Sequence, residues 1–167
     1  MPEVVLPDPP PALRNALTSL VPSGRVLIRD GISPPPGTRR LTFHDAQTRE
    51  TFEKFAAEFR HGAGARFTQL PGGRVELSAH DANEFLCKKD YLKNWHIEVH
   101  EEFGPFTLGE WGAVLRECGF APLHLHEYCN GWIVENRYQG HVTITDTDDR
   151  PVPWPATNAV IVAEKPA

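Results

Sequence analysis

Proline is the residue that most restricts where this chain can form regular structure. Sixteen of the 167 residues are proline, and most stand in three clusters, at Pro2–Pro11, Pro34–Pro36 and Pro151–Pro155. Proline lacks a backbone N–H and restricts the residue before it, so each cluster interrupts helices and strands. We therefore expect a proline-rich lead-in over residues 1–10 and regular elements only between the clusters.

Several segments between the prolines have the pattern of amphipathic helices. Residues 11–20 carry apolar side chains at i, i+3, i+4 and i+7, and the segment that Asp45 can cap repeats this spacing with phenylalanines. Thr107 and Glu110 form the capping-box pattern that begins a helix. A further helix is expected from residue 81 to about Trp95.

Other segments have the pattern of strands. The short apolar run 25–29 is typical of a buried strand, and residues 66–70 and 74–78 alternate on either side of Pro-Gly-Gly, which predicts a β-hairpin. Three later strands are expected at residues 123–128, 141–145 and 158–164. This order of elements predicts one α/β domain over residues 1–167.

Composition excludes several classes of protein. The net charge of −5 argues against a general nucleic-acid-binding protein. No apolar run approaches the roughly 18 residues of a membrane span, so no membrane association is expected. The three cysteines form no CxxC pair, and the odd count suits reduced thiols in the cytoplasm.

Three segments together resemble the C-terminal half of class I, S-adenosylmethionine-dependent methyltransferases. Residues 20–30 look like the L-x-P-G-G turn and fifth strand of that fold, with Ser23 in place of the first glycine. Residues 106–120 are similar to the last helix of the family, which commonly ends in Gly-Phe. Residues 123–128 and 158–164 match the sixth and seventh strands.

The resemblance implies a partial Rossmann-like sheet whose antiparallel last strand inserts between the fifth and sixth, with residues 66–78 as an inserted β-hairpin. It also implies S-adenosylmethionine as cofactor, yet the glycine-rich turn that binds it is missing. The only candidate, Gly62-Ala63-Gly64, follows a helix and is better explained as a helix end. The chain therefore resembles the substrate side of such an enzyme, with a partner chain or a lost N-terminal half supplying the cofactor site.

The segment His96-Ile97-Glu98-Val99-His100 contains our candidate catalytic residues. As a strand it places His96, Glu98 and His100 on one face, and as a helix it places the two histidines on one face. Either geometry can supply an acid/base pair or bind a metal ion. We assign the three as candidate catalytic residues and name no metal ligands.

Seven residues are candidate substrate contacts. Two lie at the carboxyl end of the first strand, where open α/β sheets bind ligands. A lysine and a tyrosine belong to a basic and aromatic cluster that can engage a phosphate and stack on a ring. Three lie in the connection before the last strand, a segment that can instead anchor itself as a small apolar core. The seven are Arg29, Asp30, Lys89, Tyr91, Trp132, Asn136 and Arg137.

The sequence thus favours a methyltransferase-like domain, inactive without its cofactor half. One alternative is a non-catalytic interaction module, in which a second copy of the chain or another partner covers the open sheet. The other alternative is a metal-dependent enzyme that uses the histidines.

Overall fold

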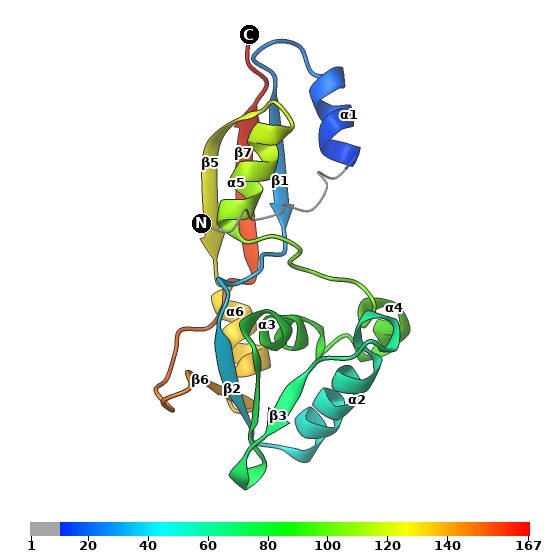
Figure 1. Cartoon of the computed structure of the whole chain (residues 1–167), viewed down its shortest axis with the longest axis vertical. Coiled ribbons are helices and arrows are strands. Elements are labelled where there is room, and N and C mark those ends of the chain that lie inside the picture. Colours follow the sequence, from blue (N-terminus) through cyan, green and yellow to red (C-terminus); the bar gives the residue numbers. More distant parts are fainter. Residues whose placement is uncertain (1–10) are drawn as a thin grey trace.

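The computed structural model describes residues 11–167, in two lobes that Figure 1 shows one above the other. The expected lead-in over residues 1–10 lies outside the described residues. Each lobe has its own β-sheet and its own apolar core. Between residues 11 and 167 no helix is both long and apolar enough to cross a membrane.

The first lobe is built on a three-stranded sheet. Its strands are β1 (Arg25–Asp30), β7 (Asn158–Glu164) and β5 (Ala121–Tyr128), in the order β1-β7-β5. The last strand, β7, lies between the other two and runs antiparallel to both, as expected. It follows that β1 and β5 point the same way and that their carboxyl ends share one edge of the sheet.

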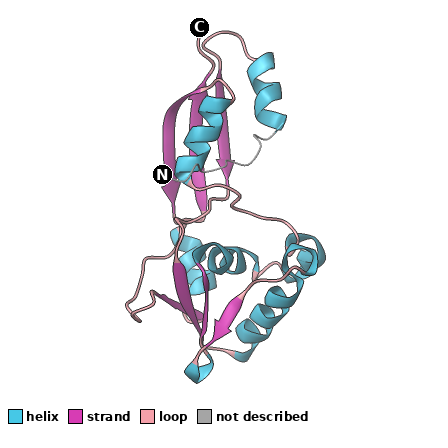
Figure 2. Ribbon diagram, in the orientation of Figure 1, coloured by secondary structure: helices cyan, strands magenta, loops and turns pink. Residues whose placement is uncertain are grey.

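Two helices cover one face of this sheet (Figure 2). They are α1 (Pro11–Ser19) and α5 (Leu108–Glu117), and both were predicted from the apolar spacing. The capping box of Thr107 and Glu110 is present at the start of α5. Apolar residues of both helices pack with every second residue of β7, among them Ile161.

The second lobe is built on a four-stranded antiparallel sheet in the order β3-β4-β2-β6. The strands are β2 (Thr38–Phe43), β3 (Phe67–Gln69), β4 (Val75–Ser78) and β6 (Val142–Thr145). The helices packed with it are α2 (Ala46–Gly62), α3 (Ala79–Lys88) and α4 (Trp95–Glu98). Short helical turns lie at Pro71–Gly73 and Leu92–Asn94, and α6 (Gly131–Ile133) continues into a π-helical turn, Val134–Tyr138.

This arrangement corrects the expected fold. The chain is α/β, but its strands form two separate sheets, and every strand pairing in residues 11–167 is antiparallel. The hairpin β3–β4 was correctly predicted, yet it does not stand as an isolated insertion, because β4 pairs with β2, which pairs in turn with β6. We did not predict β2, because Thr-Arg-Arg-Leu-Thr-Phe has few apolar residues and gains its strand structure from pairing on both sides.

The third predicted helix is shorter than expected. Helix α3 ends at Lys88, not near Trp95, and the side chain of Ser78 caps it by accepting a hydrogen bond from the N–H of Asp81. The residues after it form short separate turns, so the alternative of a strand over residues 96–103 is wrong.

The lobes are joined where two backbone segments cross. Residues 31–33 leave β1 and run against residues 103–106, and the N–H of Ser33 donates to the carbonyl oxygen of Phe106 at 2.9 Å. The side chain of Asn83 donates to the carbonyl oxygen of Ile32 at 2.9 Å. Because both bonds fix backbone, the crossing holds the end of β1 against α3.

We expect the stability of the second lobe to fall at acidic pH through Asp45, the N-cap of α2. The N–H of Thr48 donates to this carboxylate at 2.7 Å, and this bond, with that of His141, lowers the pKa of Asp45 to about 2. Because the pKa of Asp45 is lower in the folded chain than in the unfolded chain, the ionised carboxylate stabilises the fold above about pH 4. This stabilisation is lost as the pH falls toward 2. Asp45→Ala should cost about 1 kcal/mol at neutral pH and less near pH 2, measured by urea unfolding.

Candidate functional site

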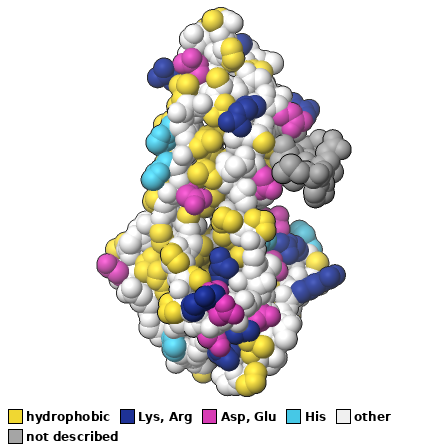
Figure 3. Space-filling model, turned by 60° about the vertical axis from the view of Figure 1, so that its left-hand side comes forward, with side chains coloured by type: hydrophobic (Ala, Val, Ile, Leu, Met, Phe, Trp, Pro, Cys, Tyr) yellow, Lys and Arg dark blue, Asp and Glu magenta, His cyan; other side chains and the backbone are white. Residues whose placement is uncertain are grey.

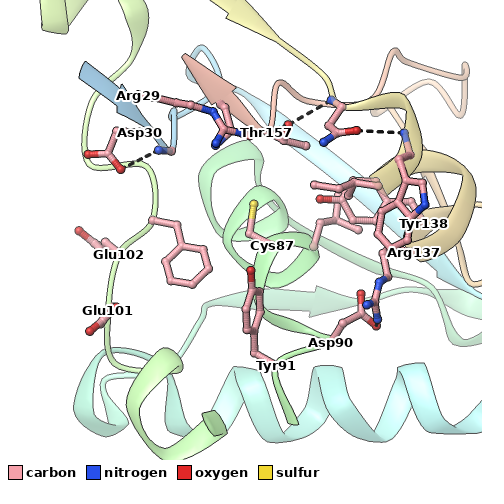
Figure 4. A pocket seen from close by; sticks show the side chains of 17 residues that line it. Arg29, Asp30, Cys87, Asp90, Tyr91, Glu101, Glu102, Arg137, Tyr138 and Thr157 are labelled. Carbon is pink, nitrogen blue, oxygen red and sulfur yellow. Dashed lines mark hydrogen bonds and ion pairs between the residues drawn. The ribbon is translucent and has the colours of Figure 1, made fainter. Parts of the chain in front are cut away.

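A cavity of about 610 Å³ opens where the two lobes meet (Figure 4). The carboxyl end of β1, the residues after β5 and the start of β7 form one side of it, and the end of α3, residues 101–103 and the helical turn before Tyr138 form the other. Ligands of open α/β sheets bind at the carboxyl ends of strands, which is the edge that this cavity occupies. We therefore take the cavity as the candidate site.

Strand β1 contributes a charged pair to the cavity. The Nε of Arg29 donates to the hydroxyl oxygen of Tyr128 at 2.9 Å, which ties the end of β1 to the end of β5. Asp30 accepts a hydrogen bond from the N–H of Gly31 at 2.8 Å. Arg29 and Asp30 both line the cavity, and their role as substrate contacts stays a prediction.

The end of α3 and the residues after it contribute Cys87, Asp90 and Tyr91. Burial, with the nearby carboxylate of Glu84, raises the pKa of Cys87 to about 12, so this thiol is protonated at neutral pH and is not a nucleophile. Asp90 accepts two hydrogen bonds from the ammonium group of Lys89, at 3.0 and 3.1 Å. The ring of Tyr91 stands in Figure 4 with its hydroxyl directed into the cavity.

The turn from Gly131 to Tyr138 closes another side. Trp132 is 59% exposed, and the guanidinium of Arg137 lies 5.6 Å from the centre of its ring. Arg137 is also 3.9 Å from Asp90. Tyr138 is buried, and burial raises its pKa above the ordinary range. The anchoring core that we considered for this segment is also present, because Ile133 packs against the core of the second lobe.

The segment Glu101-Glu102-Phe103 is held in place by a buried ion pair on α3. Glu84 accepts hydrogen bonds from the N–H groups of Phe103 and Gly104, at 3.1 and 2.9 Å, and pairs with Lys88 one helical turn later. The side chains of Glu84 and Lys88 are both fully buried, and the Lys88 ammonium lies 3.9 Å from the centre of the Phe103 ring. Sequence reasoning missed this pair, although the i, i+4 spacing of Glu84 and Lys88 was its signal.

Glu102, which lines the cavity, is paired with Arg60 of α2. Partial burial opposes its ionisation, but the hydrogen bond from Arg60, at 2.6 Å, the charge of Arg60 and the nearby His80 together outweigh burial and lower the pKa of Glu102. Arg60 also pairs with Asp81 of α3 at 3.1 Å.

Two of the seven predicted substrate contacts do not line the cavity. Lys89 is buried against Asp90 and faces a second, smaller cavity of about 110 Å³ instead. Asn136 donates to the carbonyl oxygen of Trp132 at 2.9 Å and thereby stabilises its own helical turn. The other five, namely Arg29, Asp30, Tyr91, Trp132 and Arg137, all lie along the cavity.

The candidate catalytic residues lie on and after α4, and none of them lines the cavity. His96 is exposed and Glu98 half-buried, and His100 stacks on His61 with ring centres 4.3 Å apart. The strand that would have placed all three side chains on one face is not formed. Their catalytic role stays a prediction, but the structure does not bring them to the candidate site.

No group of three or more His, Cys, Asp or Glu side chains within residues 11–167 is arranged to hold a metal ion. Comparisons with protein families, with curated proteins and with solved structures found no match. The residues that line the cavity include two arginines, four carboxylates and several aromatic rings.

Proposed function

We propose that this chain is the substrate-binding half of an S-adenosylmethionine-dependent methyltransferase. The observation that carries the proposal is the position of the cavity at the shared carboxyl edge of β1 and β5, with β7 antiparallel between them. This strand order is the one that the resemblance implies for the last three strands of a Rossmann-like sheet.

The chain's own part in such a reaction is to bind and orient the methyl acceptor. Residues from both lobes enclose the cavity, and aromatic side chains such as Phe103 shield part of it from water. Holding the accepting atom in line with a methyl group removes orientational freedom that would otherwise oppose the reaction.

The described residues do not fit S-adenosylmethionine. The glycines at Gly62–Gly64 end α2, and the N–H groups of Ala63 and Gly64 are already donated to carbonyl oxygens of the same helix. A nucleotide-binding turn needs free N–H groups after a strand. We therefore derive no chemical step from this chain alone and assign the cofactor site to another polypeptide segment.

The first sheet offers a surface for that segment. The face opposite α1 and α5 bears Leu27, which is 70% exposed, and its cross-strand neighbour Val162 is half-buried. Figure 3 shows hydrophobic side chains spread over the surface of this lobe. An antiparallel sheet with one solvated face normally alternates apolar and polar residues, whereas β7 reads as a nearly continuous apolar run, the pattern of a strand covered on both faces. The same surface favours the second candidate, a non-catalytic module that pairs with another copy.

The test is S-adenosylmethionine binding by the chain alone and by the complex that a tagged chain forms in the cells that produce it. We expect calorimetry to detect no binding by the chain alone and micromolar binding by the complex, because the cofactor site needs both parts. Trp132→Ala should leave cofactor binding by the complex unchanged, because Trp132 lies in the proposed acceptor cavity.

Two results contradict the proposal. Micromolar binding by the chain alone would refute the split site. A homodimer by light scattering that binds no S-adenosylmethionine, with no other chain in the complex, would favour the non-catalytic module instead.

A further inference from the structure

Among residues 11–167, Arg29 lines the cavity without forming an ion pair, whereas Arg137 is paired with Asp90, and this difference points to a class of ligand. We propose that the cavity takes an organic acid whose anionic head group, a carboxylate or a phosphate, binds Arg29 while its flat apolar body lies toward Tyr91 and Phe103. The inference rests on the proposed function and names the class of methyl acceptor.

Arg29 is positioned but not neutralised. Its Nε is held by the hydroxyl of Tyr128, which leaves both terminal nitrogens of the guanidinium free to donate. Among residues 11–167 no carboxylate forms an ion pair with it, whereas Arg25 on the same strand pairs with Glu164 at 3.0 Å. A guanidinium with two free terminal nitrogens binds a carboxylate or phosphate through two parallel hydrogen bonds.

Most of the acidic side chains around the cavity already have partners. Asp90 is paired with Lys89, Glu102 with Arg60, and one oxygen of Asp30 accepts from the N–H of Gly31. Glu101 and Glu102 lie at the edge of the cavity away from Arg29 in Figure 4. Within residues 11–167 none of these carboxylates forms an ion pair with Arg29, so its guanidinium is available to a ligand anion.

Two amide groups add donors to the same end of the cavity. The side-chain oxygen of Asn130 accepts from the N–H of Trp132 at 3.0 Å, and that of Asn158 accepts from the hydroxyl of Thr157 at 3.2 Å. Within residues 11–167 the NH₂ groups of these two amides make no hydrogen bond of their own, so both can donate to a ligand. The N–H of Asn130 bonds to Thr157 at 3.1 Å, and Figure 4 shows the Arg29 guanidinium beside Thr157.

The opposite end of the cavity is aromatic. The rings of Tyr91 and Phe103 meet edge to face with their centres 5.9 Å apart. The volume of about 610 Å³ lies within the range of pockets that enclose small organic ligands, roughly 300–1,000 Å³. A charged head at one end and a flat body at the other match the two ends of the cavity.

The test uses three probes with one ring system, 2-naphthoate, 2-naphthyl phosphate and the neutral 2-naphthamide, titrated into the 167-residue chain by calorimetry. We expect at least one of the two acids to bind ten times or more tightly than the amide. Whichever acid binds more tightly identifies the head group that the cavity prefers. Arg29→Gln should abolish this preference. The matched control is Arg25→Gln, which removes the same charge from the far end of β1. This variant should retain the preference for the acid over the amide.

Equal binding of acid and amide, no binding of any probe, or a preference that survives Arg29→Gln would overturn the inference. Thermal unfolding followed by circular dichroism checks that both variants fold. The result is independent of S-adenosylmethionine binding, so an acid-binding cavity without a cofactor-binding complex would refute only the proposed function.

Discussion

Glu84→Gln should lower the free energy of unfolding by about 3–5 kcal/mol, the largest loss that we expect from a single side chain. The substitution keeps the shape of the side chain but leaves the ammonium of Lys88 buried without a counter-charge. The remaining amide oxygen also accepts less strongly from the N–H groups of Phe103 and Gly104. Since small domains are stabilised by only about 5–15 kcal/mol, urea unfolding should show a marked shift of the midpoint.

A second variant separates the charge from the packing. Glu84→Gln combined with Lys88→Met removes both charges and keeps one acceptor for residues 103 and 104, so it should recover much of the lost stability. The control is Arg150→Gln, which breaks an exposed i, i+4 pair with Asp146 and should cost less than about 1 kcal/mol. A loss for Glu84→Gln as small as that of the control would show that the buried pair is not formed.

Gly31→Ala and Gly104→Ala should each destabilise the chain by about 3 kcal/mol, because both glycines lie at the crossing between the lobes. A Cβ at position 31 would lie 1.7 Å from the carbonyl oxygen of Phe103. A Cβ at position 104 would lie 2.5 Å from the carbonyl carbon of Ile32. The obstructing atoms are backbone, so no side-chain rotation relieves the clash. Chemical unfolding of each variant measures the loss.

Gly109→Ala is the matched control for these variants. This glycine lies in the first turn of α5 with open space around it, so alanine there should be neutral or stabilise by up to about 1 kcal/mol. Gly31 and Phe103 also line the cavity, so the two crossing variants should weaken naphthoate binding as well. Variants at both positions that unfold within 0.5 kcal/mol of the unaltered chain (roughly the spread of neutral surface substitutions) would contradict the close crossing.

Local patterns predicted the elements whose structure depends on nearby residues. The N-cap Asp45, the capping box of Thr107 and the Pro-Gly-Gly turn of the hairpin all act within a few residues, and all three are present. Strand β2 was missed because its partners, β4 and β6, lie about 35 and 100 residues away in the chain. Its sequence has too few apolar residues to mark a strand without them.

The residues of the candidate site likewise include some that the local sequence predicts and others that depend on distant parts of the chain. Arg29 and Asp30 were found because a strand end is visible in the sequence and its position at the ligand edge is a general property of open sheets. His96, Glu98 and His100 were favoured by residue type and spacing, yet the short helix α4 leaves them away from the cavity. The Glu84–Lys88 pair was missed because its role depends on burial and on a backbone segment 19 residues later.

The sequence by itself determined the short-range features: where prolines interrupt the chain, where helices begin, and which strands carry apolar runs. Only the tertiary structure decided that the strands divide into two sheets, that two glycines let the lobes cross, and that Arg29 lines a cavity without an ion-pair partner among residues 11–167. The physical reason is that capping and turn formation act over a few residues, whereas strand pairing, burial of charge and cavity shape depend on residues far apart in the chain.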